Sequence, residues 1–225
     1  MKKLVALFAI TIFLCTSVNA QSVVASRHDL SFTSGGITNK STNETQVCIF
    51  CHTPHQKTIS AKPLWNKTLS AQATYGTYTS TSLTTTTVAD IGGGTGVSNL
   101  CMSCHDGTVA VNSLDNKSSL GPPTMGSATE LDATGKIAAT REAYMGVNLS
   151  NDHPINFTYD AALATADGAL KTPNSANYVD VAHEVPLYTG SLQCASCHNP
   201  HNNAQGTFLR VSNAGSALCL KCHTK

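Results

Sequence analysis

Hydrophobic and polar residues alternate nowhere along this chain with the sustained period of a β-strand. Residues 68–87 hold 12 Ser or Thr in 20 positions and lead into Gly92-Gly93-Gly94, which is typical of a loop or an irregular extended segment. Short helices are predicted near Ser98, near Asn213, across Ala161–Ala166 behind a capping Asp160, and over Lys136–Met145. The pattern therefore predicts a mostly irregular fold with short α-helices and little β-structure.

The first twenty residues have the pattern of an export signal. Lys2 and Lys3 precede an apolar run from Leu4 to Cys15, which is too short to span a bilayer, and small residues end the segment at Ala20. We expect residues 1–20 to be removed and residues 21–225 to form a single domain without a transmembrane segment. The mature protein is expected outside the cell or on its surface, with the periplasm as the alternative.

The composition argues against a nucleic-acid-binding protein and draws attention to cysteine and histidine. Charged residues make up 12% of the chain, against about 25% in a typical soluble domain, and the formal net charge is +1. No basic field argues for a nucleic-acid partner. The unusual residues are the nine cysteines and nine histidines, because their positions form a pattern.

Eight cysteines lie in four Cys-x-x-Cys pairs, and His follows each pair directly. The cysteines are Cys48, Cys51, Cys101, Cys104, Cys194, Cys197, Cys219 and Cys222, and the histidines are His52, His105, His198 and His223. This spacing is the attachment signal for c-type haem. Cysteines three apart share one face of a helical turn, so both thiols can reach the two vinyl groups on one porphyrin edge. The sequence predicts four covalently bound haems, each with the motif histidine as an iron ligand.

Two other interpretations of the cysteine pairs compete with haem attachment. Exported proteins favour disulfides, but disulfides do not explain four histidines in register. Zinc binds two Cys-x-x-Cys pairs together, but the adjacent histidines would then be superfluous. Haem attachment accounts for both residue types.

The five remaining histidines are candidates for the second ligand of each iron. His55 and His201 share a context, since each follows a motif histidine by three residues with Pro between. The Pro stops a regular helix, so these rings are expected to point toward a neighbouring haem. His28 and His153 complete the predicted set of four. His183 is the expected spare, because nothing repeats its context.

Covalently fixed macrocycles would supply the core that so irregular a chain lacks. Aromatic residues expected to pack on them are Phe32, Phe50, Trp65, Tyr75 and Tyr78. Only 20 residues separate His198 from Cys219, so the third and fourth haems are expected to lie close together.

Several segments occur together in an order that resembles a known family. They are Pro-Leu-Trp-Asn at 63–66, Cys-His-Asp-Gly-Thr at 104–108, Asp-His-Pro at 152–154, Cys-His-Asn-Pro-His at 197–201 and Phe-Leu-Arg-Val-Ser-Asn at 208–213. The chain resembles the doubled-CxxCH tetrahaem cytochromes c, most of all the OmcE-type extracellular cytochromes. The resemblance implies electron transfer through bis-histidine haems without substrate chemistry. It further implies polymerisation into filaments in which one distal histidine can come from the next subunit.

Three functions follow from these observations. The first is a subunit of a homopolymeric extracellular filament that passes electrons to redox proteins or extracellular acceptors. The second is a soluble periplasmic or cell-surface electron shuttle. The third is a multihaem reductase. Such an enzyme needs an iron with an open ligand position, whereas here five remaining histidines are available for four second-ligand positions. In the filament, His28 near the mature N-terminus is expected to be the inter-subunit ligand, with His55 next.

Overall fold

The computed structural model describes residues 22–34, 39–53, 64–84, 91, 96–126 and 129–224. Within them, regular structure consists of short pieces joined by turns and loops. The elements are η1 (Cys48–Phe50), α1 (Val97–His105), β1 (Phe157–Thr158), α2 (Ala161–Asp167), β2 (Ser191–Leu192), α3 (Cys194–Cys197), η2 (Ala214–Ser216) and α4 (Cys219–Cys222). The expected fold class, mostly irregular with short helices and little β-structure, is confirmed.

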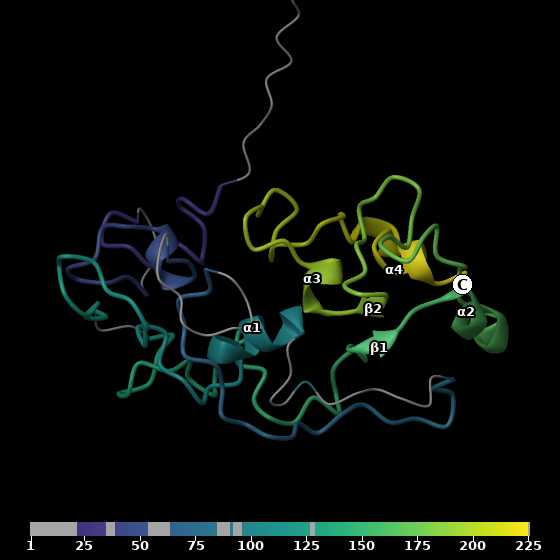
Figure 1. The fold of residues 1–225 in the computed structure, drawn as a ribbon, viewed down its shortest axis with the longest axis horizontal. Helices are drawn as coiled ribbons and strands as arrows, with labels where there is room; N and C mark the ends of the chain where they lie inside the picture. Colours follow the sequence, from purple (N-terminus) through teal and green to yellow (C-terminus); the bar gives the residue numbers. More distant parts are fainter. Residues whose placement is uncertain are drawn as a thin grey trace, which may run out of the picture.

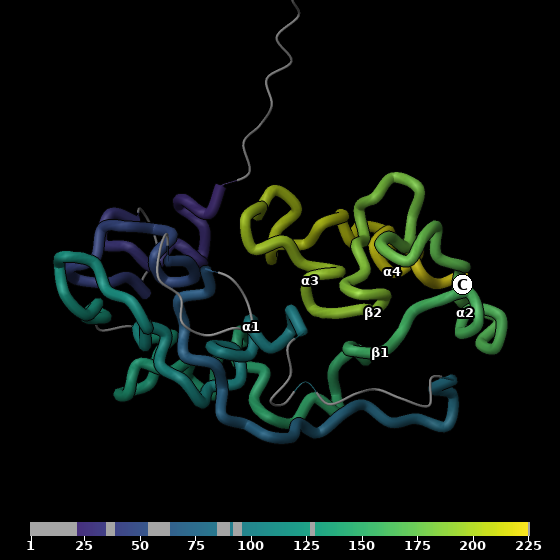
Figure 2. The backbone as a smooth tube through the Cα atoms, in the orientation of Figure 1, coloured from purple at the N-terminus to yellow at the C-terminus, as the bar shows by residue number. Residues whose placement is uncertain are grey.

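The elements are arranged around a central contact between α1 and α3 (Figure 1). Residues 22–34, 39–53, 110–126 and 129–145 lie on one side of this contact, and α2, α4 and the antiparallel pair β1–β2 lie on the other. Residues 64–84 run along one edge from the first side to the second (Figure 2). There Thr84 donates a hydrogen bond of 2.8 Å to Asp167 at the end of α2. No helix of the described residues is long and apolar enough to cross a membrane.

The hydrophobic core is divided into three small clusters. One surrounds the β1–β2 pair and contains Phe157, Tyr159, Val179, Val185, Leu187 and Leu192. The other two are built from Tyr75, Ile91, Met102 and Leu149, and from Ile49, Phe50 and Leu114. Each cluster contains or adjoins a residue of a Cys-x-x-Cys-His motif. The packing therefore centres on the motifs and not on a continuous apolar layer.

The helix predicted over 161–166 is present as α2. Asp160 caps it by accepting a 2.8 Å hydrogen bond from the Leu163 amide, and Gly168 ends it with φ of 70°. The left-handed conformation at Gly168 is one that glycine adopts without strain.

Two expected caps have other roles in the structure. The helix predicted near Ser98 begins at Val97, and the Ser98 hydroxyl accepts a 3.1 Å hydrogen bond from the Cys194 amide of α3. The turn after Asn213 is η2, but Asn213 makes no capping bond and its Oδ1 instead accepts from Cys219 Sγ at 3.6 Å. Both polar side chains thus connect elements instead of starting them.

The helix predicted over Lys136–Met145 is wrong. Ile137 pairs with Leu131 across a tight turn in which Gly135 has φ of 80°, and successive turns follow. The Met145 amide donates a 2.8 Å hydrogen bond to the His105 carbonyl at the end of α1. Tertiary hydrogen bonding to a motif therefore overrides the local helical pattern.

The aromatic residues expected near the macrocycles have different surroundings. Phe50 and Tyr75 are buried, whereas Phe32 is 52% exposed. The Trp65 ring lies 6.0 Å from the His52 ring, and Tyr78 lines a small apolar pocket beside His153. The export signal, His55, residues 85–87 and the Gly92–Gly94 run lie outside the described residues.

Candidate functional site

Each of the four Cys-x-x-Cys-His motifs forms a helical turn. The first is η1, the second ends α1, and the third and fourth are α3 and α4. In three of them the histidine amide donates to the carbonyl of the first cysteine, at 2.8 Å for His52, 3.0 Å for His198 and 2.9 Å for His223. The turn brings two thiols to one side, as the attachment of a porphyrin edge requires. None of the eight motif cysteines forms a disulfide within the described residues.

Three motif histidines face a second imidazole that belongs to a distant part of the chain. The ring centroids are 6.0 Å apart for His52 and His201, 6.1 Å for His105 and His28, and 6.4 Å for His223 and His153. Two metal–imidazole bonds of about 2.0 Å, with roughly 1.1 Å from each nitrogen to its ring centre, place such centroids about 6 Å apart. The three pairs therefore have the spacing of two rings that ligate one iron from opposite sides.

A haem iron suits these pairs better than a bare metal ion does. Among the described residues, no group of three or more His, Cys, Asp or Glu side chains is arranged to hold a metal ion. A porphyrin supplies four of the iron's ligands, so the protein needs to supply only two. The donor set of two opposed imidazoles beside two thiols fits haem c.

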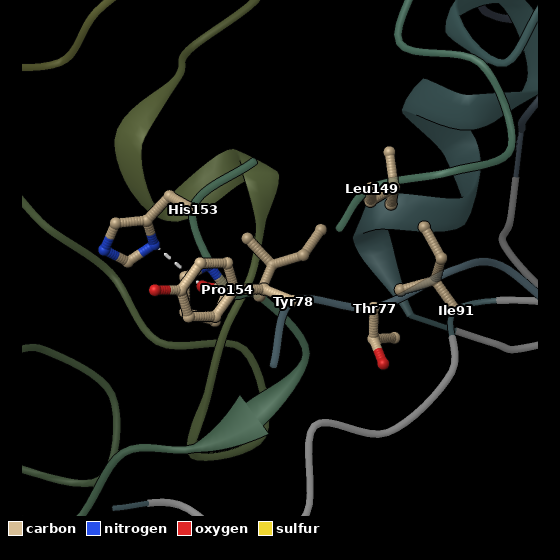
Figure 3. Close-up of a pocket in the computed structure, with 7 residues that line it drawn as sticks. Thr77, Tyr78, Ile91, Leu149, His153 and Pro154 are labelled. Carbon is tan, nitrogen blue, oxygen red and sulfur yellow. Dashed lines mark hydrogen bonds between the residues drawn. The ribbon is translucent and has the colours of Figure 1, made fainter. Parts of the chain in front are cut away.

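The imidazoles are oriented by hydrogen bonds to backbone carbonyls. Nδ1 lies 2.7 Å from the Ala143 carbonyl in His105, 3.0 Å from the Thr207 carbonyl in His198, and 2.8 Å from the Pro154 carbonyl in His153. Figure 3 shows the His153 contact beside Tyr78. When Nδ1 donates to a carbonyl, Nε2 is left with a free lone pair for a metal. These contacts favour the ligating tautomer.

Burial favours the neutral form of three of these rings, those of His28, His52 and His105. Desolvation lowers the pKa of His28 to about 4, assisted by His105 and opposed by a hydrogen bond to the Pro200 carbonyl. Burial also lowers the pKa of His52 and of His105, while carbonyl hydrogen bonds from Leu64 and Ala143 act in the other direction. Only the neutral imidazole can ligate a metal, so the environment selects the binding form.

A recurrent hydrogen-bond clamp holds three of the four motifs. In each, one residue donates twice to the motif turn, once from its backbone and once from its side chain. Its backbone N–H donates to the carbonyl of the second cysteine, in the pairs Asn66–Cys51 (2.8 Å), Arg210–Cys197 (2.9 Å) and Lys171–Cys222 (2.7 Å). Its side chain donates to the carbonyl of the residue after the first cysteine, in the pairs Asn66–Ile49 (2.7 Å), Arg210–Ala195 (2.7 Å) and Lys171–Leu220 (2.5 Å). The clamp fixes the turn that presents both thiols.

The clamp at the first and third motifs requires unusual backbone conformations. Leu64, two residues before Asn66, has φ of 66°, and Thr207 and Phe208 before Arg210 have φ of 43° and 58°. A non-glycine residue in this region costs on the order of 1 kcal/mol or more. The strain places the Thr207 carbonyl against the His198 ring and the Leu64 carbonyl against His52. Backbone strain is thus located where the motif histidines are oriented.

The four motifs form a row in sequence order. Cys51 lies beside Cys104, since burial first and the neighbouring Cys104 second raise the pKa of the Cys51 thiol. The Cys101 and Cys194 side chains lie beside each other, and their interaction raises the pKa of Cys101 and lowers that of Cys194. Cys197 in turn lies near Cys219 and Cys222. Attachment points one to four therefore follow one another through the molecule.

The structure separates His183 and His198 from the three pairs. His183 stacks on Tyr178 with ring centroids 4.3 Å apart and lines an open surface cavity with Tyr188 and Arg210. No described imidazole faces His198 at the spacing of the pairs. His55, the remaining candidate, lies outside the described residues.

His28 lies near a motif histidine of its own chain. A loop holds it opposite His105 of its own chain, with the buried Asp29 carboxylate accepting hydrogen bonds from Ala25 at 2.9 Å and from the Ser31 hydroxyl at 2.6 Å. Phe208 stacks on the other side of the ring at 4.2 Å. The ring therefore has an imidazole partner within its own chain, and its expected role as an inter-subunit ligand stays a prediction.

Sequence reasoning missed the clamp residues and the pairing of the histidines. Asn66 and Arg210 do lie within the segments that carry the family resemblance, which is the one available signal. Lys171 lies outside them, and the three donors share no residue type.

Comparison with known proteins agrees with this geometry. Residues 186–225 match the family described as the doubled CXXCH motif. No curated protein matches the chain. The match covers the third and fourth motifs and supports a multihaem c-type cytochrome, a class that binds haem c covalently and transfers electrons.

Replacing His153 by Ala tests the His153–His223 pair. In the haem-loaded protein we expect one haem to change from low-spin to high-spin and, once reduced, to bind carbon monoxide, because its iron loses one axial ligand. His183→Ala is the matched control and should leave every haem low-spin. Absorption and electron paramagnetic resonance spectra report the spin state of each variant. A high-spin haem in His183→Ala and none in His153→Ala would show that His183, and not His153, is the ligand.

Replacing Asn66 by Leu tests the clamp. Asn66 is fully buried, and its amide also bonds the Asn116 carbonyl at 2.9 Å and the Asn116 amide at 2.8 Å. The substitution leaves three backbone groups without this partner, so we expect the free energy of unfolding to fall by about 3 kcal/mol or more. The exposed Asn174→Leu should change it by about 0.5 kcal/mol at most. Equal denaturation midpoints for the two variants would contradict the clamp's importance.

Proposed function

We propose that this protein is a tetrahaem electron carrier that assembles into an extracellular filament. The observation that carries the electron-transfer part is the set of three opposed imidazole pairs, each beside its own pair of thiols. When bound, four haems would supply a row of centres that each accept and release one electron. The chain itself contributes the ligands, their orientation and a packed surrounding.

The ligand assignment follows from the pairs. His52 and His201 hold the first haem, His28 and His105 the second, and His153 and His223 the fourth. His198 ligates the third, and we assign His55 as its second ligand because it is the remaining histidine with the repeated Pro-containing context. With all four irons holding two imidazoles, the protein is an electron carrier and not an enzyme.

Proximity of the attachment points supports transfer along the row. Because Cys101 and Cys194 lie beside each other and α1 packs on α3, haems attached there would have neighbouring edges. The contacts at Cys51 and at Cys197 extend the row in both directions. Because each attachment is covalent, an exported protein keeps its cofactor in dilute surroundings.

The filament part of the proposal rests on the family resemblance and on the unmatched His198. If His55 comes from an adjacent copy, the contact is heterologous, and a rotation that does not close generates an open polymer. If His55 comes from the same chain, the protein is a soluble shuttle with the same haems. The export pattern at residues 1–20 agrees with both.

Haem stoichiometry is tested by the intact mass of the purified mature protein. We expect four haem increments on the chain 21–225 and no thiol that titrates under denaturing conditions, because eight cysteines form eight thioethers. A smaller number of increments together with free thiols would reject the four-haem assignment.

Assembly is tested with His55→Ala, using His28→Ala as the matched control. Each variant should convert one haem to the high-spin state, since each removes one distal ligand. Filaments in negative-stain images should disappear for His55→Ala and persist for His28→Ala if His55 bridges two copies. Filaments from both variants, or none from the wild-type protein, would remove the inter-subunit role of His55.

A further inference from the structure

Lys67 is a buried cation in an unusual position. Its side chain is 2% exposed, whereas lysine is almost never fully buried without a partner. Its ammonium donates to the carbonyls of Ala110 and Val111 at 3.0 Å each and to that of Ser113 at 3.4 Å. Within the described chain no carboxylate lies at ion-pair distance from it. The ammonium also forms a hydrogen bond with the Cys104 side chain. All of these partners are uncharged, so the charge of Lys67 is not compensated by a carboxylate.

The ammonium lies between the first two haem attachment points. Lys67 follows the clamp residue Asn66, and its backbone pairs with Leu114, so its position is fixed by the same contacts that hold the first motif. Its charge reaches the second cysteine of both motifs: it opposes the burial that raises the pKa of the Cys51 thiol and that of the Cys104 thiol. One buried cation therefore lies near the second cysteine of both motifs, where two haems would be attached.

We propose that the Lys67 ammonium raises the reduction potentials of the haems attached at Cys48–Cys51 and Cys101–Cys104. This inference rests on the proposed electron-transfer function. Reduction adds one negative charge to a haem, and a nearby cation stabilises the reduced form. Because the charge is buried, dissolved salt screens it much less than it screens a surface lysine.

The neighbouring charges make the effect unequal along the row. Asp106 is also buried, and its carboxylate accepts from the Tyr75 hydroxyl at 2.6 Å and from Thr108 N and Oγ1 at 2.8 Å each. Asp106 lies near Cys104 and offsets part of the Lys67 field at the second haem. In the fourth motif Lys221 is instead paired with Asp180 and Glu184, so its charge is compensated.

The experiment compares variants that change charge with variants that keep it. Lys67→Gln removes the cation and keeps hydrogen-bond donors, Lys67→Arg keeps the cation, and Lys117→Gln removes an exposed cation. Spectroelectrochemical titration of the haem-loaded proteins should show one or two of the midpoint potentials lowered in Lys67→Gln, at low and at high salt alike. Lys67→Arg and Lys117→Gln should match the wild-type protein.

Two results would overturn the proposal: unchanged midpoints in Lys67→Gln, or an equal shift in Lys67→Arg, which would indicate altered packing. Lys67→Met, which keeps the apolar stem, provides a second neutral variant if glutamine is not accommodated. Haem content and spin state are recorded on the same samples. Wild-type protein with four low-spin haems but with midpoints insensitive to Lys67 rejects this inference alone, whereas wild-type protein without them rejects the proposed function.

Discussion

The opposition of two imidazoles from distant parts of the chain is the contact on which the rest of this structure depends. The partners in the three pairs are roughly 150, 80 and 70 positions apart in the sequence, and no regular element links them. In the part of the chain that the structure describes, the longest helix has nine residues and the sheet has two strands of two residues. Closing such loops costs conformational entropy that three small apolar clusters repay only in part. Two metal–ligand bonds for each pair would supply the missing stabilisation, which explains how so irregular a chain has a defined fold.

Hydrogen bonds and burial set the orientation and the protonation state of the imidazoles in these pairs. Carbonyls of Ala143, Thr207 and Pro154 orient imidazole rings, and burial holds His28, His52 and His105 in the neutral form. The clamps at Asn66, Arg210 and Lys171 hold the turns that carry the thiols. The second motif needs no clamp of this kind, because it ends a full helix and its His105 carbonyl is bonded by the Met145 amide instead. These hydrogen bonds to backbone groups thus fix the orientation of the imidazoles and the shape of the motif turns.

The same contacts explain why the motifs form a row and why charge can differ along it. Ser98 and Gln193 connect α1 to α3, since the Cys194 amide donates to the Ser98 hydroxyl and the Ser98 amide donates to Gln193 Oε1 at 2.9 Å. This contact sets the second and third attachment points side by side. At the start of the row, segment 64–67 lies between the first motif and residues 110–116, which buries Lys67 without a carboxylate. The proximity of the motifs and the burial of Lys67 therefore arise from one packing arrangement.

The sequence by itself determined the four motifs, the helical turn within each, the irregular fold class and helix α2 with its Asp160 cap, because these depend on residues close together in the chain. Only the tertiary structure decided which histidines face each other, since spacing along the sequence does not state which distant segment returns to which motif. The same reason explains the failed helix over Lys136–Met145, where a bond to His105 outweighs local preference. It also explains why the sequence did not predict the clamps, because Asn66, Arg210 and Lys171 have in common only a side-chain donor and a position beside a motif turn. The burial of Lys67 likewise depends on carbonyls more than 40 residues away in the sequence.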